Sequence, residues 1–155
     1  MKPLDEHDRR LLQLLQKNAK LTHKELAADL GLTLTPVYER IKRLEREGYI
    51  KSYVALADRQ HLGLQLMAFC NVSLEEHQTA YLRRFEKDVR ALPEVIACYH
   101  IAGAFDYLLQ VVTENMGGYQ RFVTEKLAAL PHIRQVQSSF VMTEIKETTA
   151  LPIKK

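Results

Sequence analysis

The chain has 155 residues, a formal net charge of +3 and 46% hydrophobic residues. This length suits one ordinary domain or two small ones, with enough apolar side chains to form real cores. No stretch approaches the roughly 18 consecutive apolar residues of a membrane span, and the charged N-terminus is unlike a signal peptide, so we expect a cytoplasmic protein that does not bind membranes.

The sequence contains no recognisable catalytic or metal-binding pattern. Cys70 and Cys98 are far apart and each lies in an apolar run, so we predict core residues rather than a disulfide or zinc ligands. The six histidines do not have the spacing of metal ligands. Neither a nucleophile elbow nor a phosphate-binding glycine loop is present. We therefore predict that the protein is not an enzyme and that it needs no cofactor or metal.

The positive charge lies entirely in the first part of the chain. Residues 1–60 contain 12 Lys and Arg against 9 Asp and Glu, whereas residues 61–155 contain 10 of each. A basic first part joined to a neutral second part indicates two regions with different partners.

Two short helices are predicted at the start. Asp5 is a good N-cap for the first helix, which should end before Asn18. Thr22 and Glu25 form a capping box at the start of the second helix, and Gly31 can adopt the left-handed conformation that ends it. The apolar residues of the two helices are Leu11, Leu12, Leu14, Leu15, Leu21, Leu26, Ala27 and Leu30.

A third helix should begin at Thr33 or Thr35, with Pro36 in its first turn. Helical spacing then places one apolar set inward: Leu34, Val37, Ile41 and Leu44. The opposite face carries Thr35, Glu39, Lys42, Arg43 and Arg46, with Tyr38 at its edge. Arg40 lies nearer the core edge and fits either face.

Two helices joined by a tight glycine turn cross steeply, which leaves the outer face of the second free to enter a DNA major groove. A charged helix face is more often simply solvated, but the caps, the turn and the uneven charge favour DNA. Polar side chains near the helix start can reach base edges, and the later cations can neutralise phosphates. The predicted contacts with double-stranded DNA are Thr33, Thr35, Pro36, Tyr38, Glu39, Lys42, Arg43 and Arg46.

The pattern changes after Gly48. Residues 49–56 alternate as a strand would, and the polar segment 57–63 can connect two domains. We therefore predict a helical domain over residues 1–60 and a second domain over residues 61–155.

The second domain contains an internal repeat. Ala-Leu-Pro occurs at 91–93 and again at 129–131, each time after an amphipathic helix and before a strand. The strands are predicted at 64–74 and 107–112, and the helices at 82–92 and 119–130. Two such units form a ferredoxin-like βαββαβ sheet with both helices on one face. The uncovered face, with candidates Met67, Phe69, Ile96 and Val141, would need a partner such as a second copy, so we expect a homodimer.

Several segments together carry a resemblance to a known family. They are the helical sequence from Leu4 to Ile50, the sheet-domain motif GAFDYLL at 103–109 and the closing segment SSFVMTEIKETTALPI at 138–153. In this combination the chain resembles the Lrp/AsnC, or feast/famine, transcriptional regulators. The resemblance implies an α+β protein with a winged helix-turn-helix that binds palindromic DNA as a dimer. It also implies a sheet domain that dimerises and often forms octamers, under the control of a small effector, usually an amino acid.

The resemblance also implies an effector site between subunits, near the turn from Gly103 to Tyr107, with help from the last strand. Its candidate residues are Gly103, Ala104, Phe105, Asp106, Tyr107, Gln137, Ser138 and Ser139. Physically, the glycine lets the backbone approach a ligand, its neighbouring amides suit a carboxylate, and Asp106 can accept an ammonium group. Taken alone, a Gly and an Asp between two strands are first of all turn residues, and Phe105 and Tyr107 are packing residues.

Two other functions share parts of this pattern. The sirohaem decarboxylases, which process tetrapyrroles, have the same two-domain organisation, and His100 would be the residue to suspect there. A strand histidine is more often packed or hydrogen-bonded, and the basic third helix favours DNA. A sensor that binds an amino acid and a protein partner fits the second domain but leaves the first unexplained.

Overall fold

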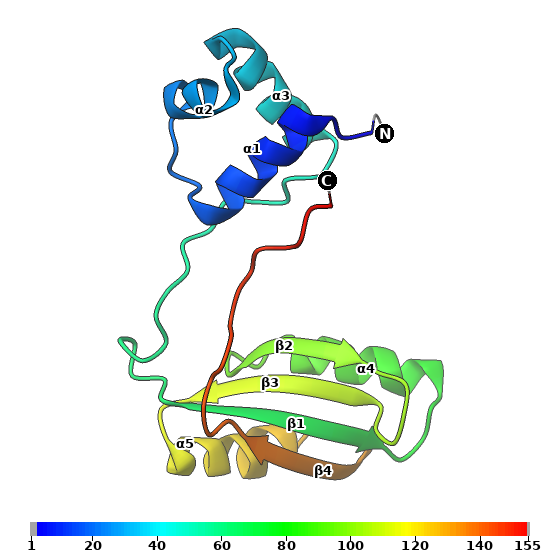
Figure 1. Ribbon diagram of the computed structural model, residues 1–155. Coiled ribbons are helices and arrows are strands. Elements are labelled where there is room, and N and C mark those ends of the chain that lie inside the picture. The colour runs from blue at the N-terminus through cyan, green and yellow to red at the C-terminus, as the bar shows by residue number, and fades with distance from the viewer. Residues whose placement is uncertain (1–2, 155) are drawn as a thin grey trace. The chain divides into compact units, whose positions relative to one another are not determined.

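The computed structural model describes residues 3–154, which form two compact units (Figure 1). The first unit contains the chain up to Leu56 together with the segment from Lys146 onward, and the second contains Ala57–Ile145. The sequence-based division instead placed all of residues 61–155 in one domain. The difference is the C-terminal segment, which returns to the first unit.

The first unit contains the three predicted helices: α1 (Glu6–Lys17), α2 (His23–Leu30) and α3 (Leu34–Arg46). Both capping boxes form, one between Asp5 and Asp8 and the other between Thr22 and Glu25. Gly31 ends α2 in the left-handed conformation with φ +65°, where a side chain would be strained.

The three helices bury one shared apolar cluster, whose fully packed members are Leu11, Leu12, Leu26, Ala27, Leu30, Val37, Ile41 and Leu44. Leu34 was expected to point inward with them, and this was wrong because its side chain is 54% exposed. Helical side chains lean toward the N-terminus of their helix. Leu34 is the first residue of α3, so its side chain projects past the helix end rather than onto a packed turn.

Residues 49–56 do not form the predicted strand. Tyr49 and Ile50 pack against the helical core, but the segment from residue 51 onward has no paired strand beside it in the described chain. Val54 and Leu56 are exposed. A strand is defined by hydrogen bonds to a neighbour, so an alternating pattern alone does not make one.

The C-terminal segment is attached to α1. Gln16 Nε2 donates to the Leu151 carbonyl at 3.1 Å, and the Leu151 amide donates to Gln16 Oε1 at 2.7 Å. Ile153 packs against the helical core. This segment, α1 and residues 49–56 surround a largely apolar cleft of about 750 Å³.

Gln16→Ala is expected to release this segment without unfolding the helices, because it removes two partly exposed hydrogen bonds worth about 1 kcal/mol in total. The Leu151 amide should then exchange with deuterium at close to the rate of an unstructured chain. Gln13→Ala on the same helix is the matched control and should leave that exchange rate unchanged. Equal exchange in both variants would show that Gln16 does not hold the segment.

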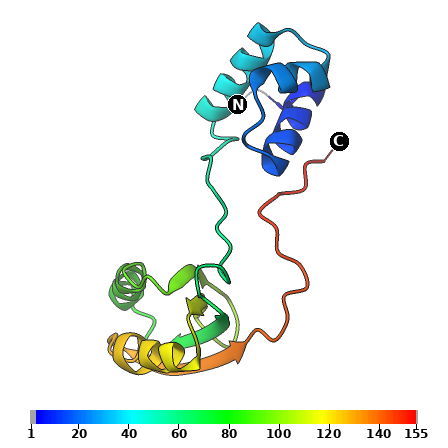
Figure 2. The same ribbon diagram turned by 90° about the vertical axis from the view of Figure 1, so that its left-hand side faces the viewer.

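The second unit has the predicted ferredoxin-like order. Its elements are β1 (Leu66–Leu74), α4 (Thr79–Val89), β2 (Val95–His100), β3 (Tyr107–Thr113), α5 (Met116–Arg121) and β4 (Ile133–Phe140), and α5 continues as a π-helix, η1 (Phe122–Leu127). The four strands are antiparallel in the order β2-β3-β1-β4. Figure 2 shows α4 and α5 on the same side of the sheet.

The strand register identifies the face that the helices leave uncovered. Cys70, Leu109 and Cys98 are aligned on three strands and belong to the core under the helices. Since strand side chains alternate, Leu108 and Tyr99 point to the other face. Of the residues predicted there, Ile96 is exposed and Phe69 and Val141 are half-buried, whereas Met67 is buried. Met67 lies on a central strand, where Gln110 Nε2 donates to its sulfur and the Val141 amide donates to its carbonyl.

Candidate DNA-binding and effector sites

The outer face of α3 presents most of the predicted DNA contacts to solvent. Thr33 occupies the N-cap position of α3 without a side-chain capping hydrogen bond, and Pro36 lies half-buried in the first turn. The exposed residues of the predicted set are Thr33, Thr35, Tyr38, Glu39, Lys42 and Arg46. They lie on the helix that follows the Gly31 turn, so the arrangement is that of a helix-turn-helix with an accessible second helix.

Tyr38 and Lys42 are partly ordered by their neighbours. The Lys42 ammonium lies 5.7 Å from the centre of the Tyr38 ring, and Tyr38 packs edge-on against His23 with ring centres 5.6 Å apart. Lys42 Nζ also lies 3.1 Å from Glu45 Oε2, and this carboxylate raises the pKa of Lys42. The Lys42 side chain remains 52% exposed, so its charge is available at the surface.

Arg43 points away from the outer face, contrary to its predicted place among the DNA contacts. Its guanidinium pairs with the carboxylate of Asp8 on α1, and the Arg43 side chain is only 15% exposed. Arg40 pairs with the same carboxylate at 2.7 Å and with Asp5 at 2.6 Å. The two arginines therefore hold α3 against α1 and are structural cations.

Asp8 is the anion at the centre of this ion-pair cluster, and its side chain is fully buried. Its Oδ2 also accepts the Asp5 amide at 3.0 Å, which closes the capping box of α1. Partial burial alone would raise the pKa of Asp5, but the Asp8 amide and the Arg40 guanidinium together lower this pKa to about 2.

The turn between β2 and β3 is a closed hairpin with an exposed tip. The Ile101 amide donates to the Asp106 carbonyl at 2.8 Å, and the Asp106 amide donates to the Val72 carbonyl at 3.0 Å. Gly103 has φ +147°, a backbone conformation that favours glycine, and no atom lies within 4 Å of the position that a Cβ would take there. Ala104 is exposed beside it, so the tip of the hairpin is at the surface.

The side chain of Asp106 is already occupied within the chain. Its Oδ2 accepts the Leu74 amide at 2.8 Å, and its Oδ1 lies 2.7 Å from His77 Nε2. Burial acts to raise the pKa of Asp106, but the Leu74 amide and His77 outweigh it and leave this pKa below its usual value. Asp106 therefore fastens the hairpin to the end of β1 and is not a free acceptor for an ammonium group. His77 was not predicted, because no local pattern links it to a residue 29 positions away.

Asp106→Ala is expected to lower the free energy of unfolding of the second unit by about 1–3 kcal/mol, because it leaves the buried Leu74 amide without an acceptor. His77→Ala removes only the exposed partner and should cost less than about 1 kcal/mol. Chemical denaturation followed by circular dichroism measures both. If His77→Ala cost as much as Asp106→Ala, the amide would not be the main reason for the stability.

Tyr107 packs inside the second unit. It is fully buried, its ring centre lies 4.6 Å from that of Phe85, and its hydroxyl donates to Glu86 Oε1 at 3.2 Å. The ring of His100 stacks on it with centres 4.9 Å apart. Burial and the Glu86 carboxylate raise the pKa of Tyr107 far above its usual value. Tyr107 and His100 thus support the start of β3 and have the packing roles that their residue types suggest.

The three predicted residues of β4 do not share a face. Ser138 aligns with Cys70 under the helices and accepts a hydrogen bond from the Tyr119 hydroxyl, which lies 3.0 Å from Cys70 Sγ. Gln137 and Ser139 are exposed and point to the opposite, uncovered face. Because β1 lies between β3 and β4, one subunit does not bring these residues to the hairpin tip.

In residues 3–154 no group of three or more His, Cys, Asp or Glu side chains is arranged to hold a metal ion. Over the same residues, no helix has the length and apolar character needed to cross a membrane.

Two family models match the chain. Residues 4–51 match a winged helix-turn-helix DNA-binding model, and residues 67–151 match the Lrp/AsnC ligand binding domain. The boundaries agree with the helical unit and the sheet unit, apart from the C-terminal segment that the second model includes.

Curated relatives match over nearly their whole length. The DNA-binding transcriptional activator DecR of Escherichia coli is 40% identical, over 97% of this chain and 99% of that protein. The leucine-responsive regulatory protein of Escherichia coli is 35% identical, over 99% of this chain and 93% of that protein. The Bkd operon transcriptional regulator of Pseudomonas aeruginosa is also 35% identical, over 99% of this chain and all of that protein.

Solved structures have the same fold. A transcriptional regulator from Neisseria meningitidis in complex with L-Met aligns with a TM-score of 0.93 and 38% identity, over 97% of each chain. An AsnC family transcriptional regulator from Agrobacterium tumefaciens aligns with a TM-score of 0.92 and 36% identity, over 96% of this chain and 97% of that one.

Proposed function

The chain belongs to the Lrp/AsnC family of transcriptional regulators, and from this premise we propose that α3 reads operator DNA while the second unit binds an amino acid that controls it. The observation that carries the proposal is the pairing of an accessible, basic second helix of a helix-turn-helix with a matched ligand-binding domain. The comparisons favour this function over the sirohaem decarboxylase alternative, because the matched family and its relatives are named as regulators and not as enzymes.

For DNA, we propose that the exposed residues of α3 divide between bases and phosphates. Thr35, Tyr38 and Glu39 lie near the start of the helix, where major-groove contacts to base edges are made. Lys42 and Arg46 lie further along the same face and neutralise phosphates. We do not include Arg43 among the DNA contacts, because its guanidinium forms an ion pair with Asp8.

For the effector, we propose the tip of the β2–β3 hairpin around Gly103, Ala104 and Phe105. An open backbone with a glycine at positive φ offers amides to a carboxylate. The regulator from Neisseria meningitidis was solved with L-Met, which supports an amino acid as the ligand class. Since Asp106 is occupied, the ammonium group must find its acceptor elsewhere. Gln137 and Ser139 of a neighbouring subunit present polar atoms for this purpose.

We also propose that the protein is a homodimer that assembles further, with an octamer as the expected form. The sheet face opposite the helices carries Ile96 and Tyr99, both more than half exposed, next to the half-buried Phe69 and Leu108. An apolar sheet face without a helix is best covered by a second copy. Such a pair would supply the two recognition helices that a palindromic operator requires. A regulator that binds chromosomal DNA works in the cytoplasm, which is where we place it.

The proposal is tested by selecting fragments of genomic DNA with the full chain at two salt concentrations, with and without a pool of amino acids. Enrichment of a palindromic site, weakened by salt and shifted by one amino acid, is the expected result. Enrichment that no amino acid changes would leave DNA recognition in place and remove the effector proposal. No enrichment under any condition would remove both.

A further inference from the structure

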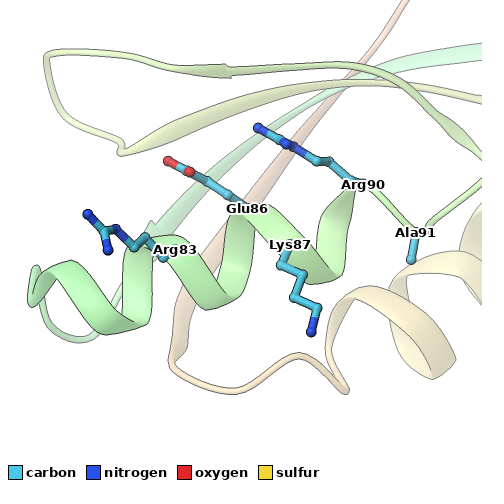
Figure 3. A pocket seen from close by; sticks show the side chains of 5 residues that line it. All are labelled: Arg83, Glu86, Lys87, Arg90 and Ala91. Atoms are coloured by element: carbon cyan, nitrogen blue, oxygen red, sulfur yellow. The ribbon is translucent and has the colours of Figure 1, made fainter.

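A second concentration of positive charge lies on α4, far along the chain from α3. Arg83, Lys87 and Arg90, with Glu86 and Ala91, line a cavity of about 440 Å³ (Figure 3). In Figure 3 the side chains of Arg83, Glu86 and Arg90 extend to one side of the helix, with Glu86 between the two arginines, and Lys87 extends to the other side.

The backbone positions of the three cations lie on one face of α4 and are called the stripe here, with the Lys87 side chain extending away from the two arginines. At 100° per residue, positions 83, 87 and 90 fall within an arc of roughly 60° on the helix surface. They span about 10 Å along the axis at 1.5 Å per residue. All three are exposed. A stripe of this length can meet more than one phosphate of a DNA backbone, which carries a negative charge about every 1.7 Å of duplex axis.

The stripe is not neutralised within the described chain. Arg84, outside the stripe, pairs with Asp88 at 3.6 Å. Glu86 lines the same cavity as the three cations and offsets one of their charges, while its Oε1 accepts the Tyr107 hydroxyl, so the group keeps a net charge of +2. No hydrogen bond or ion pair to Arg83, Lys87 or Arg90 is found among residues 3–154. Like charges one helical turn apart repel each other, so the stripe costs stability when nothing binds it.

Composition does not explain this charge. Over residues 57–145 there are 8 Lys and Arg against 10 Asp and Glu, and the stretch 83–90 alone contributes 4 of the basic residues and 2 of the acidic ones. The remainder of the second unit therefore has 4 basic against 8 acidic residues. Cations near the end of a helix also favour its dipole, which accounts in part for Lys87 and Arg90 but not for Arg83 in the middle of α4.

We propose that Arg83, Lys87 and Arg90 form a second DNA-binding surface, which contacts the phosphates of duplex DNA that flanks the operator. The inference rests on the proposed function, since α3 must first bring the protein to its operator. Guanidinium groups bind phosphate oxygens in pairs, and Arg83 and Arg90 line the same cavity on either side of Glu86, so each can meet a separate phosphate of the backbone. Contacts of this kind extend the length of duplex that the protein covers and make its affinity depend more steeply on salt concentration. They add no sequence preference.

The test compares two duplexes, the selected operator alone and the same operator between long random-sequence flanks. The variant Arg83→Ala/Lys87→Ala/Arg90→Ala is compared with a control that removes three other exposed cations of the same unit, Arg84→Ala/Arg121→Ala/Arg134→Ala. Both change the net charge equally. Affinities are measured over a salt series, and thermal melting and the oligomeric state are recorded for each variant.

The stripe variant should bind the flanked duplex roughly tenfold more weakly at low salt, and each phosphate that it no longer neutralises should make the salt slope shallower by up to about 0.9. It should bind the short duplex as the wild type does. A charge-keeping variant, Arg83→Lys/Lys87→Arg/Arg90→Lys, should retain most of the extra affinity for the flanks.

Three results would overturn the proposal. The stripe variant and the control could bind the flanked duplex equally, or the wild type could gain nothing from the flanks. The stripe variant could also bind both duplexes more weakly to the same degree. Failure of the proposed function gives a different result, because the wild type would then show no preference for the operator in either duplex.

Discussion

Asp8→Ala is expected to lower the free energy of unfolding of the helical unit by about 3–5 kcal/mol, because it removes one partner of a buried ion-pair cluster. The Asp8 side chain is fully buried, and its two oxygens face Arg40 and Arg43. Without the carboxylate, the poorly exposed Arg43 guanidinium loses its ion-pair partner, Arg40 keeps only Asp5, and the Asp5 amide loses its acceptor. A small unit has only about 5–15 kcal/mol in total, so the loss is a large share of its stability.

Thermal and chemical denaturation followed by circular dichroism measure this loss, and DNA binding should fail at temperatures where the sheet unit is still folded. Glu6→Ala is the matched control, since it removes an exposed carboxylate from the same first turn and should cost less than about 0.5 kcal/mol. Asp8→Asn keeps one acceptor oxygen and should lie between the two. If Asp8→Ala melted like Glu6→Ala, the cluster would contribute nothing to the fold.

The helices of the first unit could be predicted because their boundaries are set by local chemistry. Asp5, Thr22 and Gly31 act on amides and carbonyls within four residues of themselves, and all three cap as the sequence indicated. The ion-pair cluster could not be predicted in this way. It joins Asp8 to arginines 32 and 35 positions later, and a helical wheel gives the direction of a Cβ, whereas the long side chain of Arg43 bends back to the core edge.

The turn that carries the candidate effector site was predicted, but the contacts of its residues were not. The turn and Gly103 followed from the residue types, whereas the use of Asp106 depends on the Leu74 amide and His77 across the sheet end. The alternation of side chains along β4 follows from strand geometry alone. Three consecutive strand residues therefore cannot all contact one ligand, and Ser138 faces the helices. The strand expected at 49–56 and the return of the C-terminal segment both depend on tertiary partners that local patterns do not contain.

Lys42→Ala/Arg46→Ala is expected to reduce operator affinity at low salt by more than tenfold and to make its salt dependence shallower. Both cations are exposed on α3 beyond the residues that reach base edges. Each phosphate that is no longer neutralised should change the slope of log K against log salt by about 0.9. Two such phosphates in each half of a dimer should therefore change this slope by about 3.6 in total. Fluorescence anisotropy with the selected operator over a salt series measures both quantities.

Two single variants separate the roles on α3. Thr35→Ala should alter preference among operator sequences by about 1–3 kcal/mol at one position and leave the salt slope as it is. Arg43→Ala should lower the melting temperature of the helical unit, because its guanidinium pairs with Asp8. Below that temperature it should retain the salt slope of the wild type. The opposite result would be a shallower salt slope in Arg43→Ala and an unchanged one in Lys42→Ala/Arg46→Ala. Arg43 would then be the cation that contacts DNA, and the assignment of the recognition face would be wrong.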